Sequence, residues 1–115
     1  MGIAFHSYQE AAWGTASYPD KGENLIYPSL GLTGEAGEAA DKVKKYWRNF
    51  GFTKGKELTQ DQRAELVKEI GDVLWYIAAI ASELGYSLEH VAEMNIAKLK
   101  DRQTRGVIKS EGDNR

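Results

Sequence analysis

Two pairs of carboxylates with the same spacing are the residues best suited to chemistry. Glu35 and Glu38 are three positions apart, and so are Glu69 and Asp72. A glycine stands directly before the second acid of each pair. Side chains at positions i and i+3 lie on one face of a helix, so each pair presents two carboxylates side by side. Helical periodicity puts the first acid of each pair at the border of an apolar stripe, where two helices meet.

Four carboxylates in one place repel one another, and removing them from water is costly. A bound cation relieves both effects. Carboxylate oxygens are hard ligands that suit Mg²⁺ or Mn²⁺ better than Zn²⁺. The pairs therefore predict an Mg²⁺ site, with Mn²⁺ as a second candidate ion, held by Glu35, Glu38, Glu69 and Asp72.

The acidic pairs have two other interpretations. The first is a helix bundle without metal, in which salt bridges neutralise the acids and Glu38 pairs with Lys42 at i+4. The second is a di-iron bundle, which requires E-x-x-H motifs on two helices. The sequence disfavours di-iron, because neither His6 nor His90 lies three residues after a glutamate.

A site that acts on phosphates also needs cations and polar groups. Lys42 continues the face of the first acidic pair. Asn95, Lys98 and Arg102 fall within about 80° of one another on a helix. Lys98 and Arg102 are candidates for phosphate contact, although a solvated basic helix end is the plainer alternative. Asn95 shares the direction of apolar residues, and Tyr76 follows the second acidic pair by one turn. Asn95 is a candidate for substrate contact or for a structural hydrogen bond to buried partners, and Tyr76 is a candidate for substrate contact or for core packing.

Four helices and no strand are predicted, so the fold class is all-α. Capping boxes, in which side chains satisfy the first backbone N–H groups, indicate where two of them begin. Ser7 with Glu10 opens the first helix, and Thr59 with Gln62 opens the third. Ser87 is a cap for the fourth. The helices are predicted at about residues 8–16, 25–48, 60–84 and 88–104.

The length, net charge and cysteine count of the chain restrict the class of protein. A chain of 115 residues fits one domain, with a polar tail from about residue 107. A net charge of −2 gives no positive field for a nucleic acid polymer. The absence of cysteine excludes disulfides, thiolate metal sites and cysteine nucleophiles. No apolar run approaches the ~20 residues of a membrane helix, and residues 1–6 lack the basic and then apolar pattern of a signal peptide. These features favour a cytoplasmic protein without a membrane partner.

Residues 73–81 are apolar nearly all round. A helix in a small bundle ordinarily keeps a polar outer face. Coverage of this segment from both sides requires more protein than one short chain offers. A homodimer or homotetramer is therefore expected.

The sequence resembles the MazG-like nucleotide pyrophosphohydrolases of the all-alpha NTP pyrophosphatase superfamily. Residues 30–38, LGLTGEAGE, resemble the first family motif, and residues 69–76, EIGDVLWY, resemble the second. Asn95 to Leu99 followed by Arg102 resembles the motif that contacts phosphate in that family. The likeness extends over roughly residues 7–106.

The resemblance implies Mg²⁺-dependent hydrolysis of (deoxy)nucleoside triphosphates at the α-phosphorus, giving a monophosphate and pyrophosphate. It also implies a four-helix MazG-like bundle completed by oligomerisation. By this likeness Glu35, Glu38, Glu69 and Asp72 hold the metal, and Glu38 is our candidate to orient the attacking water. A non-catalytic, metal-dependent nucleotide-binding or regulatory bundle is the main alternative. A structural protein whose apolar helix only serves assembly is another.

Overall fold

The structure, a computed structural model, describes residues 2–106 of the chain. In these residues the elements are four α-helices and one 3₁₀ turn, with no strand, which confirms the all-α class. The polar tail predicted from about residue 107 lies outside the described residues. The elements are α1 (Phe5–Thr15), α2 (Ile26–Phe50), η1 (Gly55–Glu57), α3 (Gln60–Leu84) and α4 (Leu88–Arg105).

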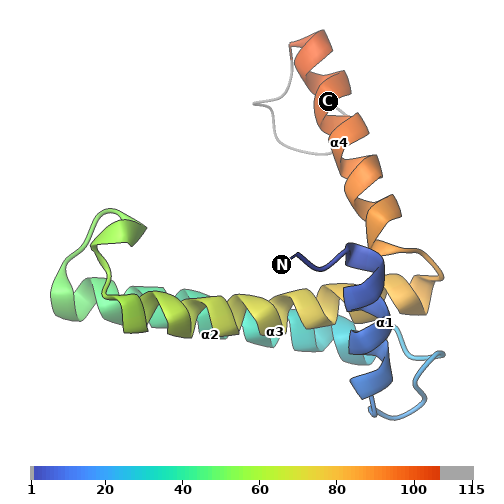
Figure 1. Cartoon of the computed structure of the whole chain (residues 1–115), viewed down its shortest axis with the longest axis horizontal. Coiled ribbons are helices and arrows are strands. Elements are labelled where there is room, and N and C mark those ends of the chain that lie inside the picture. The colour runs from blue at the N-terminus through green and yellow to red at the C-terminus, as the bar shows by residue number, and fades with distance from the viewer. Residues whose placement is uncertain (1, 107–115) are drawn as a thin grey trace.

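The long helices α2 and α3 form an antiparallel hairpin, and α1 crosses the C-terminal half of α3 (Figure 1). Small side chains permit the close approach of α1 to α3. Ala12 of α1 is buried in one cluster with Ala78 and Ala81 of α3 and with Leu88, the first residue of α4. This packing fixes α1 beside the stretch of α3 that follows the second acidic pair.

The predicted start and end of α3 are both confirmed. The Thr59 hydroxyl accepts a hydrogen bond from the Gln62 amide at 3.0 Å, and the Gln62 side chain accepts one from the Thr59 amide at 2.9 Å. Gly85 ends the helix in the left-handed region at φ 79°, where glycine is favoured. Ser87 caps α4 by accepting from the His90 amide at 3.0 Å.

The predicted start of the first helix is wrong. The helix begins at Phe5, and the capping box of Ser7 and Glu10 does not form. The Ala4 carbonyl already accepts a hydrogen bond from the Tyr8 amide at 3.0 Å. The helical ladder therefore starts one turn earlier, and Ser7 lies inside the helix. The second helix continues to Phe50, past the predicted end at 48.

The loop between α1 and α2 is fastened to α3 by one carboxylate. Glu83 accepts hydrogen bonds from the Tyr18 hydroxyl, from the Gly22 amide at 2.8 Å and from the Asn24 amide at 3.0 Å. Burial alone would raise the pKa of Glu83, but these hydrogen bonds outweigh it and lower that pKa. Tyr18 also stacks on Tyr27 with ring centroids 4.9 Å apart. The loop thus ties the start of α2 to α3.

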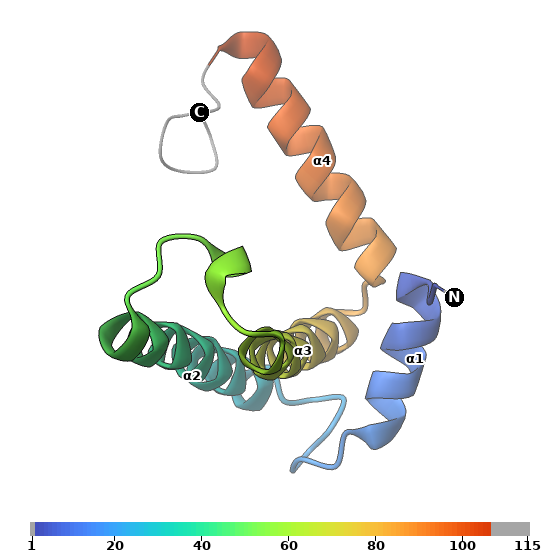
Figure 2. The same ribbon diagram turned by 60° about the vertical axis from the view of Figure 1, so that its left-hand side comes forward.

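The fourth helix leads away from the hairpin (Figures 1 and 2). The radius of gyration is 16.8 Å, against about 13 Å for a compact domain of this length. A single copy is therefore an open arrangement in which α4 is packed at its start and projects beyond. Among the described residues, no helix combines the length and apolarity needed to cross a membrane.

Candidate metal centre

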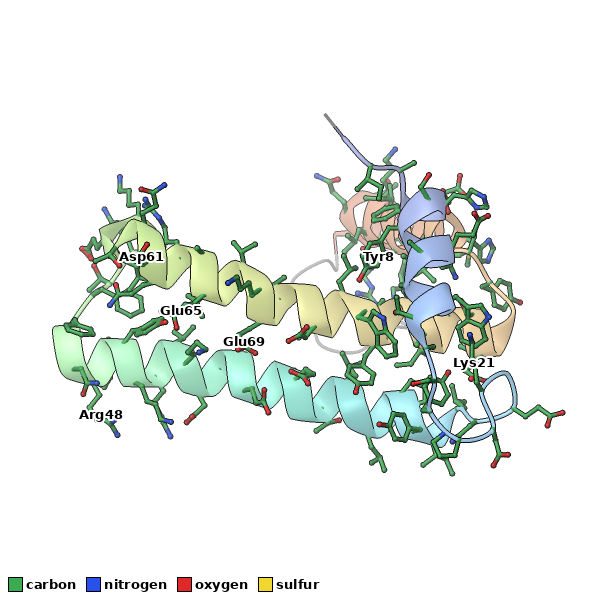
Figure 3. The ribbon with its side chains drawn as sticks, turned by 60° about the horizontal axis from the view of Figure 1, so that its bottom comes forward. Tyr8, Lys21, Arg48, Asp61, Glu65 and Glu69 are labelled. Atoms are coloured by element: carbon green, nitrogen blue, oxygen red, sulfur yellow. The ribbon has the colours of Figure 1, made fainter. Side chains whose placement is uncertain are left out.

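Three of the four predicted carboxylates come together between α2 and α3. One oxygen each from Glu35, Glu69 and Asp72 lies within 4.8 Å of the others. Glu69 points from α3 toward α2 (Figure 3). One oxygen of Glu35 and one of Glu69 are buried, and neither has a hydrogen-bond partner in residues 2–106. Buried polar atoms are normally satisfied, so these two oxygens are the clearest sign that a ligand belongs here.

The electrostatics of the cluster favour a cation. Burial raises the pKa of the Glu35 carboxyl, and the neighbouring carboxylates Glu38, Asp72 and Glu69 raise it further. A divalent ion among these oxygens would lower the pKa of each carboxyl group, because it favours the charged form of every ligand. The donor set is all carboxylate, which fits a hard ion such as Mg²⁺. The acidic cluster is thus chemically suited to a divalent metal.

Glu38 lies outside this cluster of three. Its side chain is exposed, although its carboxylate is near enough to Glu35 to raise the pKa of that group. It borders a cavity between α2 and α3 together with Asp41, Lys42, Lys45 and Glu69. Glu38 therefore stands at the solvent side of the carboxylates, between the cluster and a partly basic surface.

Lys42 is engaged by acids of α3. Its ammonium nitrogen lies 3.5 Å from a Glu65 oxygen and 3.7 Å from a Glu69 oxygen. Burial works to lower the pKa of Lys42, but Glu65 and Glu69 outweigh it and raise that pKa. The competing prediction of a pair between Lys42 and Glu38 is not what the structure has. Lys42 instead neutralises part of the charge beside Glu69, because both residues face the seam between α2 and α3.

A groove of about 390 Å³ opens on the other side of the cluster. Its lining joins two carboxylates, two aromatic side chains and one hydroxyl: Glu35, Asp72, Trp75, Tyr76 and Thr15. Burial raises the pKa of Tyr76 first, and the nearby Tyr27 hydroxyl and Glu35 carboxylate add to it. Tyr76 was predicted to lie near the acids, and the structure places it there.

Trp75 and Thr15 are site residues that sequence reasoning missed. The Trp75 indole nitrogen donates a hydrogen bond to the Thr15 hydroxyl at 2.8 Å, across 60 positions of sequence. Only the crossing of α1 over α3 brings them together. The one available signal was that Trp75 immediately precedes Tyr76, inside the second motif.

The structure does not bring the polar residues of α4 to the carboxylates within one chain. Asn95 is exposed, Lys98 is half-buried and Arg102 is buried. The expectation that Asn95 lies against the core is wrong for a single copy, because α4 leads away from the α2–α3 hairpin (Figure 2). All three residues lie on α4, as helical periodicity predicts. Periodicity does not predict what this face of α4 contacts.

Comparison with known proteins identifies the family. The model of the MazG nucleotide pyrophosphohydrolase domain matches residues 28–107, a range that contains both acidic pairs. The chain belongs to the MazG nucleotide pyrophosphohydrolase family. MazG proteins generally depend on a divalent metal, and the cluster of Glu35, Glu69 and Asp72 fits that requirement.

Two relatives extend the comparison. Gene 37 protein of Mycobacterium phage L5 is 47% identical over 113 residues, which cover 94% of this chain and 96% of the relative. Uncharacterized protein YvdC of Bacillus subtilis (strain 168) is 39% identical over 72 residues, or 62% of this chain and 68% of the relative. No solved structure matches the chain. The MazG domain match begins after α1, so α1 is not part of the matched range.

We expect the stability of the metal-free protein to depend on pH through Glu35. The pKa of Glu35 in the folded state is raised above its ordinary value of 4.5. Stability from this group is therefore fully present below pH 4.5 and is lost as the pH rises through the folded-state pKa. Urea unfolding of the wild type and Glu35→Gln, in EDTA at several pH values, measures this effect. The variant should gain on the wild type as the pH rises, and a constant difference would contradict the clustering.

Proposed function

We propose that this protein is an Mg²⁺-dependent pyrophosphohydrolase that converts (deoxy)nucleoside triphosphates to monophosphates and pyrophosphate. One observation carries the proposal. In a MazG family member, Glu35, Glu69 and Asp72 each bring one carboxylate oxygen within 4.8 Å of the others, and Glu35 and Glu69 each also have a buried oxygen without a hydrogen-bond partner in residues 2–106. Several carboxylate oxygens this close together are suited to a divalent ion that also binds the phosphates of a substrate.

Each carboxylate has a role in this proposal. Glu35, Glu69 and Asp72 would hold Mg²⁺, for which Mn²⁺ could substitute. When bound, the ion would supply neutralisation of phosphate charge and a lowered pKa for the attacking water. Glu38, on the solvent side, orients that water and accepts its proton. The water oxygen forms a bond to the α-phosphorus while the bond from that phosphorus to the bridging oxygen breaks. Pyrophosphate leaves with the bridging oxygen.

Lys42 and Tyr76 contact the substrate in this proposal. The Lys42 ammonium group borders the cavity that also contains Glu38, so it can neutralise phosphate oxygens next to the reacting centre. Tyr76 borders the groove on the opposite side of the cluster. The two cavities flank the carboxylates, which is consistent with a substrate that extends across them.

We also propose a homodimer or homotetramer. Large apolar side chains of the hairpin are each more than half exposed in one copy: Ile26, Leu30, Trp47, Val67 and Ile70. Exposed apolar area of this extent ordinarily marks an interaction surface. A neighbouring copy would also face α4, and we assign Asn95, Lys98 and Arg102 to phosphate contact in a neighbouring subunit's site. We expect the enzyme to act in the cytoplasm, where nucleoside triphosphates are used.

Pyrophosphate release from a panel of NTPs and dNTPs tests this function. Release is expected with Mg²⁺ or Mn²⁺ and should stop in EDTA, because the carboxylates cannot activate water without the ion. Equilibrium binding of the same nucleotides runs in parallel. Metal-dependent binding without release would support the non-catalytic nucleotide binder instead. Neither binding nor release by the folded protein would leave only a role in assembly.

A further inference from the structure

The wall of the groove opposite α2 comes from α1, which precedes the residues matched to the MazG domain. Thr15, the last residue of α1, lines the groove together with the acids Glu35 and Asp72 and the aromatic residues Trp75 and Tyr76. Tyr8 of α1 also lies close to Asp72: burial raises the pKa of Tyr8, and the Asp72 charge adds to that shift. The groove therefore brings acidic and aromatic side chains together.

The Trp75 ring is held in one orientation by a short chain of hydrogen bonds. Its indole N–H donates to the Thr15 hydroxyl at 2.8 Å. The Thr15 hydroxyl in turn donates to the Ala12 carbonyl at 2.7 Å within α1. A hydroxyl has one proton to donate, so Thr15 has none left for a ligand. The polar atoms of Thr15 and Trp75 are thus engaged with each other, and Trp75 offers the groove an apolar ring.

Tyr76 forms a corner with this ring. The Trp75 and Tyr76 centroids are 4.9 Å apart, and the ring planes meet at 84°. One ring therefore presents its edge to the face of the other. The corner lies next to Asp72, where the proposed metal and phosphates are expected.

We propose that Trp75 is the surface on which the nucleobase of the substrate stacks, and that Thr15 is the residue that positions it. This inference rests on the proposed function, because the carboxylates must hold the phosphates for the base to reach the aromatic corner. Every nucleobase has a face that can stack on an aromatic ring. Because the indole N–H is engaged by Thr15, stacking here does not read base edges. Purines and pyrimidines should both be accepted at this position.

Affinity for a nucleoside triphosphate and for ribose 5-triphosphate, which lacks only the base, tests the inference. Ca²⁺ replaces Mg²⁺ in these measurements, and titration calorimetry and tryptophan fluorescence give the affinities. Trp75→Leu should weaken nucleotide binding roughly tenfold or more and leave ribose 5-triphosphate binding unchanged. Thr15→Val keeps the side-chain volume but removes the hydroxyl that accepts the hydrogen bond of the Trp75 indole. The ring is then no longer held in one orientation, and nucleotide binding should weaken severalfold.

Matched controls separate this role from folding. Tyr86→Leu removes an exposed aromatic ring that stacks on His90 away from the groove, and Thr33→Val removes a hydroxyl that bonds only within α2 at 3.4 Å to the Ser29 carbonyl. Neither should change the affinity ratio of the two ligands. Equal weakening of both ligands by Trp75→Leu, or full nucleotide affinity in folded Trp75→Leu, would overturn the inference. Binding without turnover in the wild type would refute only the proposed hydrolysis.

Discussion

Asp72→Asn should lower metal-dependent pyrophosphate release by about a thousandfold, since a metal supplies several kcal/mol of charge stabilisation in such reactions. The amide keeps the size of the side chain but removes the charge that Asp72 contributes to the cluster with Glu35 and Glu69. The same variant should lose most of the thermal stabilisation that Mg²⁺ gives the wild type. That stabilisation is about 2.7 kcal/mol when the ion is present at a hundred times its dissociation constant.

Asp61→Asn is the matched control for this change. Asp61 lies on the same helix, in the first turn of α3, and at the far end of the hairpin from α1 (Figure 3). It should retain the full rate and the full response to Mg²⁺. A rate for Asp72→Asn within tenfold of the wild type would exclude Asp72 from the metal site. An equal loss in Asp61→Asn would point to general charge effects on nucleotide binding.

Gly31→Ala should destabilise the fold by about 1–3 kcal/mol, the usual cost of overpacking. A Cβ atom at this position would overlap the Cε1 and Cζ atoms of the Tyr76 ring. Alanine favours helix over glycine by up to about 1 kcal/mol, so propensity alone predicts the opposite sign. The ring cannot move freely, because Trp75 packs beside it at 4.9 Å. Urea unfolding gives the difference.

Gly34→Ala tests the same glycine-to-alanine change on the same helix without the contact. A Cβ atom at Gly34 would have no neighbour within 4 Å among the described residues. This variant should gain up to about 1 kcal/mol. Combining Gly31→Ala with Tyr76→Leu should recover most of the lost stability. If Gly31→Ala were as stable as Gly34→Ala, the Tyr76 ring would not be held against α2 at all.

The helices could be predicted from sequence where local chemistry decides them. The third helix was placed correctly because Thr59 and Gln62 satisfy each other's amides and Gly85 adopts a left-handed backbone. The first helix was begun too late, although its capping pattern was of the same kind. Ser7 and Glu10 match the capping pattern, but the Ala4 carbonyl takes the first helical hydrogen bond instead.

The candidate site could be predicted only in part, for a physical reason. The i, i+3 spacing indicates which face of each helix carries its acids. The proximity of Glu35 to Glu69 and Asp72 could therefore be predicted from the sequence. The partner of Trp75 was not, because Thr15 is 60 positions away and is brought there by helix crossing. The face of α4 on which Lys98 lies could also be predicted from helical periodicity. What that face contacts could not, because α4 leads away from the α2–α3 hairpin of its own chain.

The outward course of α4 ties the order of this helix to protein concentration. Most of the stability of a helix in a protein comes from tertiary packing of one of its faces. The fourth helix has 18 residues. Leu88 anchors the start of α4 in the core, while the turns beyond lead away from α2 and α3 (Figure 1). With the proposed neighbouring copy packed on α4, dilution would loosen α4 before it loosens the hairpin. The carboxylates of Glu35, Glu69 and Asp72 would then stay assembled at concentrations where α4 had already frayed, so the proposed metal affinity and substrate affinity would respond differently to protein concentration.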